Sequence, residues 1–167
     1  MGQVIDLYYR FDEKITFFMR EYGILALRIS VGIVFFWFGF LKFFPGLSPA
    51  QGIATNTIEK LTFGLIPAAV ALIILAVWET LIGLGLIFGI YLRATLFLLF
   101  TQMMGTLTPL IFFPAETFTR FPYAPTLEGQ YIIKNLVLIS AGLVVGATVR
   151  GGRIMEDKAK ARKNNPE

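Results

Sequence analysis

Four runs of mostly apolar residues alternate with shorter, more polar stretches along the chain. The runs cover about residues 24–44, 65–88, 92–113 and 129–149. Each run is close to the roughly 20 residues that a helix needs to cross a membrane. The pattern therefore predicts an all-α, multi-pass membrane protein whose four transmembrane helices form a bundle over residues 24–150.

Residues 1–23 follow a different pattern, in which apolar side chains recur every three or four positions and charges occupy the other side. The apolar stripe consists of Val4, Tyr8, Phe11, Ile15, Phe18 and Tyr22. This spacing is typical of an amphipathic helix. We expect the helix to lie at the cytoplasmic membrane interface and to lead into the first span. A docking surface for a partner protein is the alternative use of the same stripe.

The distribution of basic residues predicts the orientation of the spans. Three Lys or Arg residues precede the first span and six follow the fourth, whereas the loops 45–64 and 114–128 hold one each. Because cytoplasmic segments carry the excess of Lys and Arg, both termini and the tight second turn are predicted to be cytoplasmic. Together with Arg150, the basic tail 151–167 carries most of the net charge of +4. Attraction to anionic lipid explains that charge without any nucleic-acid partner.

Composition narrows the chemistry that the chain can perform. Hydrophobic residues make up 56% of it and charged residues 16%, and it contains neither Cys nor His. A typical soluble domain is about 25% charged, so this composition also favours a bundle surrounded by lipid. Without Cys or His, the chain alone cannot form a disulfide, a Cys/His zinc site or a Ser-His-Asp triad. We therefore expect no metal site, and any redox centre would belong to a partner or a bound cofactor.

Ionisable residues inside the predicted spans are costly in lipid, so they usually face the bundle interior and mark functional sites. Arg28 lies in the first span, and Glu79 is the deepest acid of the second. Helix rise places Glu79 about 13 Å and Arg28 about 6 Å from the cytoplasmic end, which predicts an Arg28–Glu79 ion pair. Gln102 of the third span lies at the depth of Glu79. Arg28, Glu79 and Gln102 form the expected inner polar network, with Glu79 as the candidate proton relay. The alternative is that they only hold helices together.

A second polar layer is expected nearer the outer end of the bundle. It combines Lys42 of the first span with Lys134 and Asn135 of the fourth. Two cations without an acid in their spans could pair with acids of the loops, only hold helices together, or receive an anionic or carbonyl head group. Trp37 and Trp78 lie mid-span rather than in the usual interfacial belt, so they would either pack in the core or line a pocket for a flat ligand. These five residues are the candidate ligand-binding set.

Three stretches carry the likeness to a known family. They are FWFGFLKFFPGLSP at 36–49, WET at 78–80 with the glycines that follow, and GQYIIKNL at 129–136. Together they resemble the DoxX family of bacterial and archaeal membrane proteins, over about residues 24–150. The resemblance implies a four-helix bundle in the cytoplasmic (inner) membrane and a link to quinone-coupled sulfur oxidation and membrane redox complexes. Other four-span quinone enzymes use a Cys pair, which this chain does not contain.

Three functions stay open at this point. The first is binding of quinone/quinol or a similar amphipathic ligand, as a subunit of an electron-transfer or oxidative-stress complex. The second is a non-enzymatic accessory role in a larger membrane complex or a homo-oligomer. The third is a carrier or receptor for a small solute, a lipid or an exported cargo. Quinone is the one cofactor that the resemblance suggests. Whether the chain is an enzyme, as a quinone-linked oxidoreductase subunit with a partner's redox centre, stays undecided.

Overall fold

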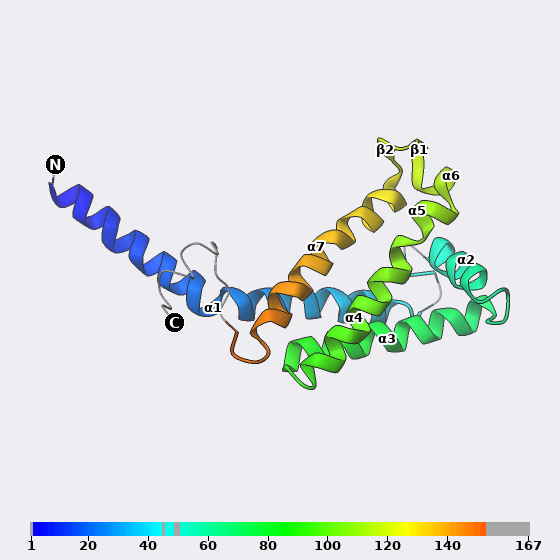
Figure 1. Cartoon of the computed structure of the whole chain (residues 1–167), viewed down its shortest axis with the longest axis horizontal. Helices are drawn as coiled ribbons and strands as arrows, with labels where there is room; N and C mark the ends of the chain where they lie inside the picture. The colour runs from blue at the N-terminus through cyan, green and yellow to red at the C-terminus, as the bar shows by residue number, and fades with distance from the viewer. Residues whose placement is uncertain (1, 45, 49–50, 153–167) are drawn as a thin grey trace, which may run out of the picture.

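The computed structural model describes residues 2–44, 46–48 and 51–152. Within this part of the chain, four helices are long and apolar enough to cross a membrane: Tyr8–Leu41, Ala68–Phe88, Leu92–Phe112 and Leu127–Thr148. They correspond one to one to the four predicted runs. The prediction of an all-α bundle with four spans is therefore confirmed (Figure 1).

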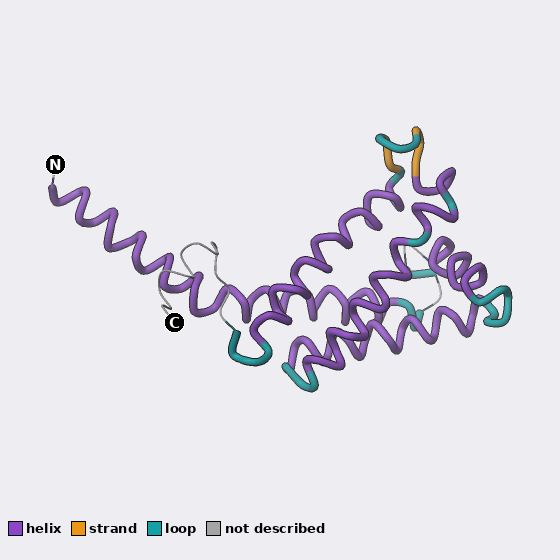
Figure 2. The backbone as a smooth tube through the Cα atoms, in the orientation of Figure 1, coloured by secondary structure: helices purple, strands orange, loops and turns teal. Residues whose placement is uncertain are grey.

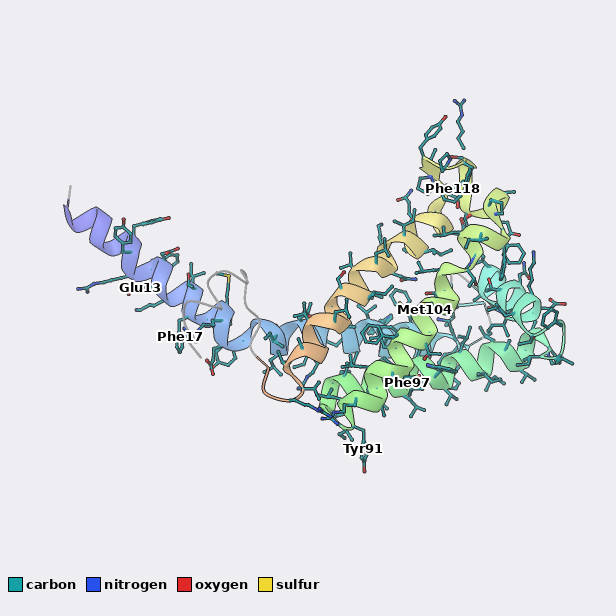
Figure 3. All side chains as sticks on the ribbon, viewed as in Figure 1. Glu13, Phe17, Tyr91, Phe97, Met104 and Phe118 are labelled. Atoms are coloured by element: carbon teal, nitrogen blue, oxygen red, sulfur yellow. The ribbon has the colours of Figure 1, made fainter. Side chains whose placement is uncertain are left out.

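The first span and the amphipathic segment before it form a single helix, α1 (Gly2–Leu41). The expected boundary at residue 23 is not a break in the helix, because nothing near it stops helical hydrogen bonding. The N-terminal half of α1 extends beyond the other helices as an arm (Figure 1), from which Glu13 and Phe17 project clear of the bundle (Figure 3). Every side chain from Tyr8 to Tyr22 is exposed. The interfacial position of this arm stays a prediction.

The second and third spans are joined by a tight turn. Helix α3 (Ala68–Phe88) ends at Gly89, whose left-handed backbone closes the helix, and α4 (Leu92–Leu107) begins after Tyr91. The predicted third span continues past Leu107, but the helix is interrupted at Thr108 and resumes as the short α5 (Pro109–Phe112). Proline has no backbone N–H to donate and its ring crowds the preceding turn. Pro109 therefore accounts for the interruption.

The two long loops contain structure of their own. Helix α2 (Gln51–Leu61) lies in the first loop and packs against α3. The other loop holds α6 (Pro114–Thr117) and a small antiparallel pair of strands, β1 (Phe118–Arg120) and β2 (Ala124–Pro125), drawn in orange in Figure 2. They are the only strands among the described residues. Helix α7 (Leu127–Thr148) then begins at Thr126, whose hydroxyl accepts a hydrogen bond from the Gly129 amide at 3.1 Å.

The four spans close into a ring, in which α1 packs on α3, α3 on α4, α4 on α7, and α7 on α1. Their shared core consists of Val31, Phe35, Ile82, Leu86, Leu96, Leu99, Met103, Ala141 and Val145. The α1–α3 pair is the closest, because glycines let the two backbones approach. A Cβ added at Gly39 would lie 2.7 Å from the Cβ of Glu79, and one added at Gly83 would collide with the backbone of Phe36. These contacts fix which residues of α1 face which residues of α3.

Three arginines gather at one end of the bundle, which we call the arginine end. Arg28 lies against Gly89 at the C-terminus of α3, while Arg93 and Arg150 border one groove between α4 and α7. The opposite end carries α2, α5, α6 and the strands (Figure 1). Of the predicted basic tail 151–167, residues 153–167 lie outside the described residues.

Candidate functional site

Three polar side chains from different parts of the bundle meet in its interior. The Lys42 ammonium lies 2.5 Å from Glu79 Oε2, and Gln102 Nε2 donates a hydrogen bond to Glu79 Oε1 at 2.7 Å. Lys42 follows the last residue of α1, Glu79 lies in α3 and Gln102 in α4. All three are buried, with exposed fractions of 9%, 9% and 7%. We call them the Lys42–Glu79–Gln102 cluster.

The local backbone explains why Lys42 reaches Glu79. Gly39 of α1 packs directly on Glu79, and Lys42 comes three residues later, within one helical turn. The Lys42 ammonium also donates to the Phe38 carbonyl at 3.3 Å, so its own helix helps to hold it. A charge at this depth needs a partner, because removing it from water costs several kcal/mol. The glycine contact therefore places Lys42 beside the partner that its charge needs.

The predicted Arg28–Glu79 ion pair is wrong. A Cβ on Gly89 would lie 2.6 Å from the Arg28 guanidinium, so Arg28 sits level with the very end of α3. The prediction placed the beginning of the first span level with the end of the second. In the structure Gly39 of α1 packs on Glu79, so α1 is displaced along α3 relative to the prediction, and this displacement brings Lys42 within reach of Glu79. The predicted proximity of Glu79 and Gln102 is confirmed.

The five candidate ligand-binding residues do not form one pocket, so the interpretation of a separate outer layer is wrong. Trp37 is 63% exposed, because it lies two positions after the buried Phe35 and points to the other side of α1. Lys134 is also exposed, with its ammonium 5.6 Å from the centre of the Tyr131 ring. The other three make contacts inside the protein: Lys42 joins Glu79, Trp78 donates to the Leu98 carbonyl at 3.1 Å, and Asn135 donates to the Thr106 hydroxyl at 3.3 Å.

Buried polar atoms almost always have a hydrogen-bond partner. Among the described residues, three buried side-chain atoms have none: Arg28 Nε, Thr80 Oγ1 and Gln102 Oε1. The last belongs to the cluster itself. Thr80 was missed by the sequence reasoning, although it follows Glu79 directly in the WET stretch and its amide nitrogen lies close to Gly39.

The unused hydrogen-bonding capacity of the cluster defines its chemistry. A lysine ammonium has three N–H donors, and Lys42 directs two of them to Glu79 and Phe38. Gln102 Oε1 is an acceptor with no donor. The cluster can therefore offer one donor and one acceptor to a polar head group. In the part of the chain that the structure describes, no three His, Cys, Asp or Glu side chains lie close enough to hold a metal ion.

A sequence profile for DoxX matches residues 23–115, which is more than half of the chain. The chain belongs to the DoxX family. The matched part of this DoxX protein runs from the middle of α1 to α6 and includes every residue of the Lys42–Glu79–Gln102 cluster. The stretch 129–136 in α7, which also carries the resemblance, lies beyond the match. No curated protein and no solved structure matches the chain. This DoxX protein is a multi-pass membrane protein whose exposed apolar helix faces contact lipid.

Proposed function

We propose that this DoxX protein binds quinone/quinol, or a similar amphipathic ligand, at the Lys42–Glu79–Gln102 cluster. It would do so as a subunit of an electron-transfer or oxidative-stress complex in the cytoplasmic membrane. The observation that carries the proposal is the buried oxygen of Gln102, which accepts no hydrogen bond although it lies beside an ion pair. A ligand that brings its own O–H or N–H donor would satisfy this atom.

Each residue of the cluster has a distinct task in this proposal. The third N–H of Lys42 donates to a carbonyl oxygen of the head group, and Gln102 Oε1 accepts from a hydroxyl group. Glu79 can hold a proton at its carboxyl group next to the head group, as expected of a relay. A bound quinone would supply the capacity to accept electrons and protons. Because the chain contains no Cys or His, the electron donor would be a partner protein or its cofactor.

Titration of the purified protein with a short-chain quinone tests the proposal, together with extraction of the lipids that co-purify. Two variants remove the proposed ligand contacts: Gln102→Leu, and the double variant Lys42→Met/Glu79→Gln, which leaves no unpaired charge buried. Lys134→Met is the matched control, because it makes the same Lys-to-Met change at an exposed position.

We expect saturable quinone binding by the wild type and by Lys134→Met. Loss of one hydrogen bond to the head group should weaken binding about tenfold in Gln102→Leu. Absence of quinone from the extract together with absence of saturable binding would refute the proposal. Equal binding by all variants would show that quinone binds away from the cluster.

The arm of α1 supports a second function, that of an accessory subunit. Its side chains from Tyr8 to Tyr22 are all exposed, and aromatic residues recur along it. Such a surface suits either a membrane interface or a partner protein. These two uses can be distinguished by isolating the full-length chain and a chain without residues 1–22 in a gentle detergent. A partner that co-purifies only with the full-length chain supports the accessory role, and recovery of monomers or homo-oligomers alone from both chains contradicts it.

A further inference from the structure

A groove of about 390 Å³ runs between α4 and α7 at the arginine end. Leu96, Phe97 and Phe100 of α4 form one wall, and the backbone at Gly146 of α7 contributes to the other. Phe97 is 69% exposed. The groove therefore opens toward the surroundings of the bundle, and its walls are largely apolar.

Two glycines of α7 explain where the groove lies. At Gly142 the helices touch, since an added Cβ would come within 3.1 Å of the Phe100 ring. One turn later, a Cβ at Gly146 would make only an ordinary contact, 3.5 Å from Leu96. Because Gly146 has no side chain, the space beside Leu96 and Phe97 stays open. A leucine or a larger residue at position 146 would fill it.

Arg93 and Arg150 border the groove at the end of the two helices, and both are exposed. Among the described residues, no acidic side chain lines the groove, and the one ion pair joins Lys42 to Glu79. An arginine guanidinium keeps its charge and binds phosphate through two parallel N–H donors. Two such groups therefore stand beside an apolar channel that faces lipid.

We propose that this groove binds an anionic phospholipid. The phosphate lies between Arg93 and Arg150, and an acyl chain follows Leu96 and Phe97 over Gly146. Charge complementarity selects the anionic head group, and the open apolar walls select a ligand with a hydrocarbon chain. The site uses none of the residues of the Lys42–Glu79–Gln102 cluster, so it stands independently of the proposed quinone function.

Native mass spectrometry of the full-length, delipidated protein tests this site with phosphatidylglycerol and phosphatidylcholine added separately. The wild type should retain phosphatidylglycerol in preference to phosphatidylcholine. Arg93→Gln/Arg150→Gln should weaken phosphatidylglycerol binding about 10- to 30-fold, as expected for the loss of two charges near a lipid head group. The control Lys60→Gln/Arg120→Gln removes two exposed charges at the opposite end and should bind phosphatidylglycerol like the wild type.

Two further measurements separate the two parts of the ligand. Gly146→Leu should weaken the binding of both lipids, because it fills the acyl-chain groove and leaves the arginines in place. Inorganic phosphate alone should compete poorly, since it lacks a hydrocarbon chain. The proposal is overturned if Arg93→Gln/Arg150→Gln keeps the wild-type preference for phosphatidylglycerol. It is also overturned if inorganic phosphate at low millimolar concentration displaces the lipid completely.

Discussion

Lys42 and Glu79 show how two charges can be stable at membrane depth. Each is almost fully buried, and each supplies the partner that the other needs. Gln102 adds a hydrogen bond to the second carboxylate oxygen of Glu79. Removing one partner leaves an uncompensated buried charge, whereas removing both leaves an ordinary polar or apolar contact. The pair should therefore behave as a unit when it is mutated.

A double-mutant cycle measures that coupling. We expect Lys42→Met and Glu79→Gln each to lower the free energy of unfolding by about 3–5 kcal/mol, because each leaves a buried charge unpaired. In the double variant, the loss in the free energy of unfolding should be smaller than the sum of the two single losses by at least about 1 kcal/mol. Reversible unfolding in detergent, followed by tryptophan fluorescence, gives these values.

Lys134→Met is the control for the cycle and should change the stability by no more than about 0.5 kcal/mol, as is usual at the surface. Strict additivity of the two single substitutions would contradict a coupled pair.

Some of the site can be predicted by counting residues along each helix. Glu79 and Gln102 lie at the same depth, and this follows from the helix rise and the position of each residue in its span. The charged partner of Glu79 cannot be predicted in this way, because it depends on how far α1 is displaced along α3. Contacts at Gly39 and Gly83 fix that displacement, and the ends of the apolar runs do not reveal it. The outward direction of Trp37 likewise depends on which face of α1 meets the other helices.

At the scale of helices, the α1–α3 contact organises the molecule. Gly39 and Gly83 remove side chains where the two backbones cross closest, and the cluster lies beside this contact. Collision of a new side chain with a neighbouring backbone cannot be relieved by rotating a side chain. The helices themselves would have to separate, and Lys42 would then be drawn away from Glu79.

Gly83→Ala tests the importance of this approach. A single methyl group would collide with the backbone of Phe36, so we expect a loss of stability of about 1–3 kcal/mol and a lower melting temperature. Gly105→Ala in α4 is the control, because nothing lies within 4 Å of the added Cβ. Alanine there should leave stability unchanged or raise it by about 0.5–1 kcal/mol. Equal melting temperatures for the two variants would mean that the α1–α3 contact tolerates a methyl group.

The helices were largely predictable, and their interruptions were less so. Runs of about 20 apolar residues identify spans reliably, since lipid imposes that length. The interruption near Thr108 could have been predicted from Pro109, which lies inside the third run. The amphipathic segment and the first span differ in composition, but this difference does not show whether the helix breaks between them. Charged and apolar residues both form helix, and no proline lies between Gly2 and Leu41.

For the whole molecule, the charges at the two ends suggest how it lies in the membrane. Arg28, Arg93 and Arg150 gather at one end, which is also where α7 ends and the arm of α1 leaves the bundle (Figure 1). Cytoplasmic ends carry such an excess of basic residues. We therefore predict that the arginine end faces the cytoplasm.

Single cysteines can report this orientation, because the chain has none of its own. Tyr91→Cys and Gly151→Cys place an exposed thiol at the arginine end, and Phe63→Cys and Tyr123→Cys place one at the other end. In intact cells, a membrane-impermeant maleimide should label positions 63 and 123 only. Positions 91 and 151 should react after the membrane is permeabilised. The reverse pattern would contradict the inferred orientation.

The groove between α4 and α7 also depends on the fold of the whole molecule. Arg93 and Arg150 are far apart in sequence, and no local pattern links them. They border one groove only because Gly142 brings α4 and α7 together in the folded bundle. The groove could therefore not be predicted from the sequence, because it depends on how distant segments meet.

An experimental density map of the natively purified protein would test the central claim most directly, namely that the Lys42–Glu79–Gln102 cluster holds the head group of a ligand. We predict density for a bound molecule within hydrogen-bonding distance of Gln102 Oε1 and close to the Lys42 ammonium. No such density should lie beside Lys134. A map in which Gln102 Oε1 is hydrogen-bonded by the protein itself or by a water molecule alone, with no ligand at the cluster, would contradict the account.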